Sequence, residues 1–209
     1  MFEMHAIVMN TPATPSEGYD AWRTFGCGPV AEPEFSLIHR AIEARAATHP
    51  QHVAARFQGQ SLTYGELNRQ ANRLASLLSS HGVAPGDHVA LFVERSIPML
   101  VGMLATLKVG AAYIPQHVGI TPATQLSHIM SVASTQVVLT LSTLAHGIPL
   151  TAGQHCIHLD TFIDSPGSAA DDVNVGEDIS SPDALCFVLF TSGTTGQPNG
   201  VRVTQRNVC

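Results

Sequence analysis

The sequence predicts an α/β protein with a mostly parallel sheet flanked by helices. Short, uniformly apolar runs alternate along the chain with helical segments of ten or more residues. This order requires crossover connections, which are typical of parallel sheets whose strands are buried on both faces. With 209 residues, of which 44% are hydrophobic, the chain is long enough to bury a substantial core.

The composition argues against several functional classes. The formal net charge is -6 and no run of Lys or Arg occurs, so neither nucleic acid nor an anionic membrane surface is an expected partner. No segment has the ~20 uninterrupted apolar residues of a membrane-spanning helix, and a secretory signal pattern is missing. The four cysteines are far apart and show no CxxC spacing, which disfavours a disulfide scaffold or a zinc ribbon. We therefore expect a cytoplasmic protein.

The beginning of the chain differs in pattern from the rest. Residues 1–34 contain many prolines and glycines and no sustained period, which predicts a flexible leader or linker. Residues 35–209 are predicted to form one domain. It begins with a helical spacing of apolar residues, for which Ser36 is the expected N-cap and Pro50 the expected end.

A strand, a turn and a capped helix are predicted next. Residues 53–57 alternate as a strand does, and Gly59 supplies the turn that follows. Thr63 and Glu66 have the spacing of a capping box, so Thr63 is the predicted N-cap of a helix with a leucine-rich face. Gly82 is the predicted end of this helix.

The middle of the chain alternates short strands with helices. The predicted strands cover 89–93, 111–114 (ended by Pro115) and 136–140, and the predicted helices cover 98–109 and 122–132. Lys108 is expected to be a solvated lysine near a helix C-terminus rather than a phosphate ligand. Residues 164–182 are rich in Asp, Ser, Gly and Pro and predict a surface loop.

The clearest chemical signal follows the last predicted strand. Residues 185–190 are an apolar run that predicts a buried strand, and TSGTTGQPNG, from Thr191 to Gly200, follows directly. Glycines let the backbone approach a ligand closely, and successive backbone N–H groups in such a turn bind anions. The segment lacks the Gly-Lys-[Ser/Thr] ending of a Walker A loop. We therefore predict a site for a phosphate chain outside the P-loop class.

Three motifs resemble those of the adenylate-forming superfamily of AMP-dependent synthetases and ligases, of the nonribosomal peptide synthetase adenylation-domain type. Thr191–Gly200 resembles the superfamily's phosphate loop, residues 62–67 (LTYGEL) resemble its first core motif, and residues 107–115 (LKVGAAYIP) resemble its second. The motifs occur in the family's order, and the resemblance covers about residues 35–209. It implies the incomplete N-terminal part of the family's large domain.

The resemblance implies an ATP-dependent activation of a carboxylic acid, with an amino acid as the expected substrate. The acid attacks the α-phosphate of ATP with Mg²⁺ present, which gives an acyl-adenylate and pyrophosphate. The acyl group then passes to a thiol, usually the phosphopantetheine of a carrier domain. That domain and the remaining synthetase domains are the implied partners. The implied phosphate-binding residues are Thr191, Ser192, Gly193, Thr194, Thr195, Gly196 and Gly200.

The chain departs from the family pattern in ways that matter for activity. Asn199 stands where the family has a lysine, and Gln205 stands where it has a histidine. The Asp of the second motif is replaced within Gln116-His117. The family's catalytic segments follow the stretch matched here, so this chain alone is expected to be inactive and to leave a sheet edge exposed. A non-catalytic nucleotide-binding or interaction fragment is the alternative.

Neither a metal site nor a catalytic residue is predicted. The eleven histidines are scattered, and His155 and His158 would point to opposite faces of a strand. No serine or cysteine has a locally supported base for nucleophilic catalysis.

Overall fold

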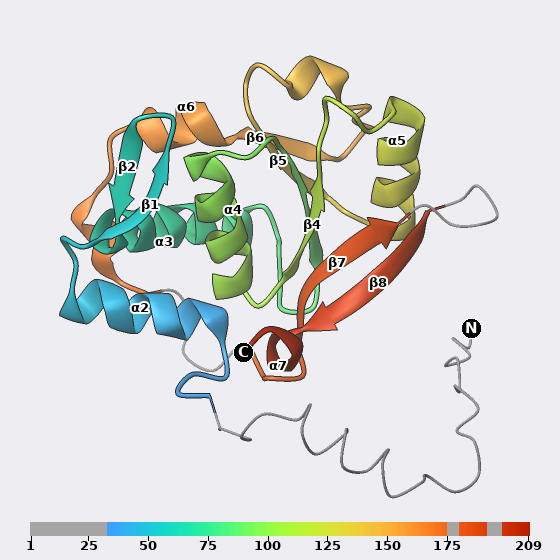
Figure 1. Ribbon diagram of the computed structural model, residues 1–209. Coiled ribbons are helices and arrows are strands. Elements are labelled where there is room, and N and C mark those ends of the chain that lie inside the picture. Colours follow the sequence, from blue (N-terminus) through green and yellow to red (C-terminus); the bar gives the residue numbers. More distant parts are fainter. Residues whose placement is uncertain (1–32, 175–179, 192–197) are drawn as a thin grey trace, which may run out of the picture. The chain divides into compact units, whose positions relative to one another are not determined.

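A computed structural model describes residues 33–174, 180–191 and 198–209 (Figure 1). Phe35–Cys209 form one structural unit and Met1–Glu34 another, and only the first is considered below. The predicted leader, apart from its last two residues, lies outside the described residues.

The unit is built on a six-stranded sheet with the strand order β6-β5-β3-β4-β7-β8. Five strands are parallel, and β8 runs antiparallel beside β7, which confirms the predicted α/β class with a mostly parallel sheet. The strands are β3 (His88–Phe92), β4 (Ala112–Gln116), β5 (Val137–Thr140), β6 (His155–His158), β7 (Leu185–Thr191) and β8 (Asn199–Thr204).

Helices cover both faces of this sheet (Figure 1). The buried side chains form two core clusters. Helices α3, α4 and α6 pack in the first cluster, and α5 packs in the second. The helices and turns are α2 (Ile38–Thr48), α3 (Tyr64–Ser80), α4 (Ile97–Lys108), α5 (Ala123–Val132), η1 (Ala145–Gly147), α6 (Leu159–Asp164), η2 (Ala169–Asp172) and α7 (Gln205–Val208). None of the described helices combines the length and apolarity needed to cross a membrane.

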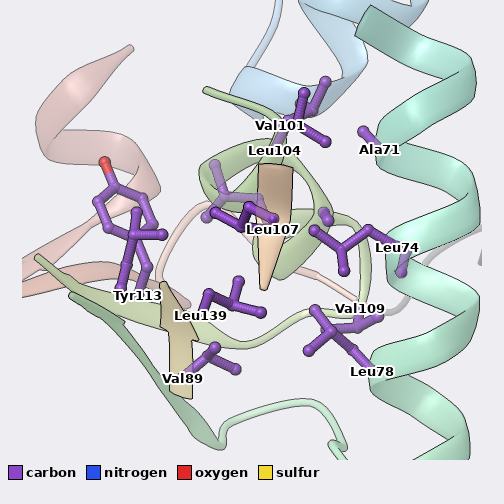
Figure 2. Packing of buried hydrophobic residues seen from close by; sticks show 14 of the residues in the cluster. Ala71, Leu74, Leu78, Val89, Val101, Leu104, Leu107, Val109, Tyr113 and Leu139 are labelled. Atoms are coloured by element: carbon purple, nitrogen blue, oxygen red, sulfur yellow. The ribbon is translucent and has the colours of Figure 1, made fainter. Parts of the chain in front are cut away.

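The larger core lies between α3, α4 and the sheet. Figure 2 shows Leu74 and Leu78 of α3 beside Val109, which follows α4, and shows Val89 and Leu139 on the sheet. All five side chains are at most 2% exposed. At about 25 cal/mol per Å² of buried apolar surface, this packing is the main force that holds α3 and α4 on the sheet.

The segment between α2 and α3 confirms two local predictions. β1 (Val53–Phe57) has the predicted bounds, and Gly59 adopts a φ of 81° in the turn before β2 (Gln60–Thr63). The Thr63 hydroxyl accepts a hydrogen bond from the backbone N–H of Glu66 (3.3 Å), while the Thr63 N–H donates to the Glu66 carboxylate (2.8 Å). Thr63 therefore caps α3 through a capping box, as predicted.

Two predicted ends were wrong. Leu37, not Ser36, is the N-cap of α2, and its side chain makes no cap hydrogen bond. Pro115 lies inside β4 instead of ending it, opposite Leu91 of β3. Because β7 pairs with β4 only through Tyr113 and Phe187, the missing N–H of Pro115 does not interrupt that ladder.

Lys108 and β7 also differ from expectation. Lys108 is fully buried and forms an ion pair with Glu43, so the predicted solvated lysine is wrong. In β7, Cys186 and Val188 are buried but Leu189 is 42% exposed, so the predicted buried strand is only half buried. A register shift between Leu185 and Phe187 interrupts the pairing of β7 with β8. Among the described strands, β8 is the last one at this side of the sheet. The expected exposed edge is therefore present.

Candidate functional site

The predicted phosphate-binding segment connects β7 to β8 (Figure 1). Thr191 ends β7, Asn199 begins β8, and the two residues pair in the antiparallel ladder. The structure therefore brings the two ends of the segment side by side at the carboxyl end of β7. The residues that lie outside the described part of the chain are Ser192, Gly193, Thr194, Thr195, Gly196 and Gln197.

Gly200, another predicted phosphate-binding residue, lies in β8 opposite Phe190. A Cβ atom at Gly200 would lie 3.1 Å from Cγ1 of Val188 and 3.2 Å from Cζ of Phe190. Such distances are too short for an unstrained methyl group beside an aromatic ring. Packing therefore supplies a reason for glycine at this position that is separate from any phosphate contact.

The segment follows the carboxyl end of β7, at one edge of the sheet. The parallel strands β3, β4 and β7 have their carboxyl ends at one edge. From this edge, the chain leads from β3 to α4 and from β4 to α5, and these helices pack in different core clusters. In open α/β sheets, ligands bind where neighbouring connections diverge in this way. The segment between β7 and β8 thus follows the strand next to β4, from which one of these connections begins.

Two residues at this edge were not selected from the sequence as site residues. Glu94 follows β3, His117 follows β4, and both side chains are exposed. A Cβ atom at Gly119 would lie 3.1 Å from Cε1 of His117 and 3.4 Å from Oε1 of Glu94, so both side chains approach the same glycine. Glu94 follows a predicted strand directly, and His117 follows another after two residues; this proximity to strand ends is the available signal, because parallel strands end at one edge.

The described part of the hairpin places no cation at the turn. Asn199 is exposed and neutral. Arg202 lies three residues later in β8, opposite Val188, where alternation along the strand directs it to the other face from Asn199. Arg206 forms an ion pair with Asp183 at 2.8 Å, and its hydrogen bond holds the pKa of Asp183 below the usual value. Neither arginine therefore replaces the family lysine.

Two cavities are lined by described residues outside β7 and β8. A polar cleft of about 480 Å³ is lined by α3 and by residues between 163 and 172. An apolar cavity of about 220 Å³ is lined by α2, α3 and α4 together with Ala54 and Tyr113. Among the residues that the structure describes, no group of three or more His, Cys, Asp or Glu is placed to hold a metal ion.

The fold and the position of the turn are together typical of α/β proteins that bind phosphate groups at strand ends. The family model of the AMP-binding enzyme matches residues 42–209, and the chain belongs to this family.

Similar proteins agree with this assignment. The chain is 37% identical over 190 residues to an adenylate-forming reductase of Coprinopsis cinerea, covering 90% of this chain and 18% of the reductase. It is 38% identical over 175 residues to tyrocidine synthase 3 of Brevibacillus parabrevis, covering 83% of this chain and 3% of that synthase. The chain thus spans less than a fifth of the length of either relative.

Solved structures share the fold. The nonribosomal peptide synthetase FmoA3 in its AMPPNP-bound form matches with a TM-score of 0.74 and 29% identity, over 86% of this chain and 18% of that one. The N-terminal subdomain of NpsA from Klebsiella oxytoca matches with a TM-score of 0.68 and 26% identity, over 82% of this chain and 43% of that one. The resemblance to the N-terminal portion of adenylation domains is therefore confirmed.

Proposed function

We propose that this chain supplies the phosphate-binding part of an adenylation domain that activates a carboxylic acid, with an amino acid as the preferred substrate class. A carboxylate oxygen attacks the α-phosphorus of ATP, the bond from that phosphorus to the bridging oxygen breaks, and pyrophosphate leaves. The acyl-adenylate then reacts with the phosphopantetheine thiol of a carrier domain, which releases AMP. The observation that carries this proposal is the position of the glycine- and hydroxyl-rich turn at the carboxyl edge of the sheet.

The residues at the turn fit a polyphosphate. Thr191 and Asn199 are exposed cross-strand partners that offer a hydroxyl and an amide at the two ends of the turn. The segment from Thr191 to Gly200 contains neither Asp nor Glu, so no carboxylate of its own repels an anion. We assign the grip on the β- and γ-phosphates to Thr191, Ser192, Gly193, Thr194, Thr195 and Gly196, with Gly200 supporting the turn. Magnesium would neutralise phosphate charge and be held largely by the phosphates themselves.

Calorimetric titration of the 209-residue chain with Mg-ATP, and separately with magnesium pyrophosphate, tests this assignment. We expect both ligands to bind. Thr191→Val should weaken binding about fivefold or more, because it removes a hydroxyl without changing the size of the side chain. The matched control, Thr191→Ser, keeps the hydroxyl and should bind nearly as the unaltered chain does. Absence of binding in a folded sample would refute the assignment.

The neutral Asn199 supports a second candidate function, a nucleotide-binding or interaction fragment without catalysis. The two candidates differ in ATP–pyrophosphate exchange dependent on an amino acid. We expect this chain alone to show none, because the family's catalytic segments lie beyond the stretch that it matches. Exchange above background would contradict that expectation and favour the first candidate.

A further inference from the structure

We propose that Lys108 is a positioning residue that holds the base of the β7–β8 hairpin in place through helix α2, and that the strap, by which we mean residues 165–174, holds Lys108 in position. The inference rests on the proposed function for the turn at the other end of this hairpin. Lys108 belongs to the second core motif (residues 107–115), so the inference gives this motif a role in placing the predicted phosphate loop (Thr191–Gly200).

The ammonium group of Lys108 joins two separate segments. Lys108 lies at the end of α4 and is fully buried. Its Nζ pairs with Oε1 of Glu43 in α2 and donates a hydrogen bond to Oδ1 of Asn174 in the strap at 3.3 Å. Glu43 also pairs with Arg40 at 2.9 Å. One buried cation therefore fixes both α2 and the strap to α4.

Asn174 receives further hydrogen bonds from α3. Its Oδ1 accepts from Nδ2 of Asn68 at 2.9 Å and from Nδ2 of Asn72 at 3.3 Å. Asn72 also donates to the backbone carbonyl of Asp171 at 2.8 Å. With Lys108, three donors from two helices converge on one amide oxygen, which fixes the end of the strap more tightly than a single surface hydrogen bond could.

The other end of the strap is fixed as well. The guanidinium of Arg73 in α3 donates to the backbone carbonyl of Ser165 at 2.7 Å and to that of Phe162. The same group lies 4.4 Å from the centre of the Phe162 ring. The strap is therefore attached to the helices at both ends before the chain continues toward β7.

Helix α2 connects this cluster to the other strand of the hairpin. The backbone N–H of Ile38, the first residue of α2, donates to Oε1 of Gln205 at 3.3 Å. Gln205 follows β8 directly, is 1% exposed, and donates its own N–H to the carbonyl of Ala184, which precedes β7. The base of the hairpin is thus bonded to α2, and α2 is held by the pair between Glu43 and Lys108.

The hairpin needs such support because its hydrogen-bonded pairing with the parallel sheet is short. β7 pairs with β4 in a single position, Tyr113 with Phe187, whereas β3 and β4 pair over five positions. A strand with one ladder pair is weakly specified in register and angle by hydrogen bonds alone. The segments that enter and leave the hairpin therefore carry part of its placement: Gln205, which follows β8, is bonded to Ala184, which precedes β7, and also to α2, which leads to Lys108.

Hydrogen exchange and nucleotide binding of the 209-residue chain test the inference. Asn174 is exposed, so Asn174→Leu removes the shared acceptor oxygen without opening a core cavity. Asn174→Asp keeps an acceptor for Lys108 and serves as the matched control. We expect Asn174→Leu to raise amide exchange at least fivefold in residues 185–191 and 199–204 and to weaken Mg-ATP binding, whereas Asn174→Asp should do neither.

A second pair of variants separates positioning from general stability. Lys108→Met should raise exchange in the hairpin as Asn174→Leu does. Val138→Ala lowers global stability through the other core cluster, in β5, which β3 and β4 separate from β7, and it should leave the hairpin's exchange, relative to that of the rest of the sheet, unchanged. Unchanged exchange in the hairpin of both Lys108→Met and Asn174→Leu would overturn the inference. Failure of the unaltered chain to bind nucleotide would refute the proposed function only, since the exchange comparison does not require a ligand.

Discussion

One side chain determines whether the turn between β7 and β8 carries a positive charge. Asn199 pairs with Thr191 at the base of the turn and offers a neutral amide. Hydrogen bonds from a charged donor to phosphate are roughly twice as strong as neutral ones. We therefore expect asparagine, in place of the family lysine, to lower the affinity for a triphosphate, whereas its ladder pairing with Thr191 is intact.

Asn199→Lys should tighten Mg-ATP binding about tenfold, which corresponds to about 1.4 kcal/mol. Asn199→Gln, a neutral side chain of comparable length, should leave the affinity near that of the unaltered chain. Calorimetry in low salt and in about 0.5 M salt provides the readout, because screening should reduce the gain of the lysine variant. Equal affinities of the lysine and glutamine variants would contradict the predicted role of charge.

A buried histidine in α2 makes stability depend on pH. His39 is 1% exposed, and burial lowers its pKa from 6.5 to about 4, with Glu43 opposing the shift and Arg40 and Lys108 adding to it. Below pH 6.5 the unfolded chain takes up a proton that the folded chain still excludes. Stability therefore falls as the pH falls from about 6.5 toward about 4.

Urea denaturation should give a free energy of unfolding about 2 to 3 kcal/mol lower at pH 4.5 than at pH 7 from His39 alone. His39→Phe keeps an aromatic ring that cannot be protonated, and this variant should lose that part of the pH dependence. His52 is exposed, so His52→Phe is the matched control and should retain it. The idea fails if both variants lose the same amount of stability on acidification.

At the scale of elements, the close contact of α4 with the sheet depends on Gly102, which has no side chain. A Cβ atom at Gly102 would lie 2.9 Å from Cδ1 of Leu91, 3.2 Å from Cδ1 of Leu159 and 3.3 Å from Cδ1 of Leu139. All three leucines are 0% exposed and so have little room to move. Glycine in mid-helix costs up to about 1 kcal/mol relative to alanine, and here the close approach of α4 to the sheet offsets this cost.

Gly102→Ala should lower the free energy of unfolding by about 1 to 3 kcal/mol despite the better helix propensity of alanine. Leu91→Val removes the Cδ1 atom that the new methyl group would approach most closely. In a double-mutant cycle measured by urea denaturation, Gly102→Ala should therefore cost less in the Leu91→Val background. Equal costs in the two backgrounds would show that the contact with Leu91 is not the cause.

The elements that could be predicted from the sequence are those with local signals. Thr63 and Glu66 are three residues apart, so the capping box and the start of α3 were predictable. β2 was missed because its four residues show no apolar pattern. Lys108 was assigned wrongly because its partners, Glu43 and Asn174, are 65 and 66 residues away along the chain. Propensity and spacing carry no information about such distant contacts.

The same limit applies to the candidate site. The position of the glycine- and hydroxyl-rich segment after β7 could be predicted because its residues occur together in one short stretch, whereas its phosphate-binding role stays a prediction. Glu94 approaches Gly119 and His117 because β3 and β4 are neighbours that end at one edge of the sheet, which requires knowing the strand order. In the sheet, β7 lies directly beside β4, although β5 and β6 come between these two strands in the sequence.

At the scale of the whole molecule, the sheet has one apolar edge that faces solvent. Leu189 of β7 and Val201 of β8 are cross-strand partners that are 42% and 50% exposed. No other described strand lies beyond β8, so its outer backbone groups are available for pairing. Exposed apolar strands at a sheet edge favour association between chains.

We expect this chain to self-associate at high concentration, and we expect Val201→Lys to weaken the association about tenfold. Ile120 is 77% exposed but lies outside the hairpin, so Ile120→Lys adds the same charge elsewhere and should have little effect. Sedimentation velocity over a range of concentrations distinguishes the two variants. A similar reduction by both would attribute the association to net charge rather than to the strand edge.

The burial of Lys108 has a practical consequence for covalent chemistry. It is the only lysine of the chain, so acylating reagents and lysine-modifying enzymes have a single side-chain target, and the folded protein encloses it. Its ammonium must separate from Glu43 and lose its proton before it can act as a nucleophile. The rate at which an acetylating reagent labels this amine therefore measures how often α2 and the strap move away from α4.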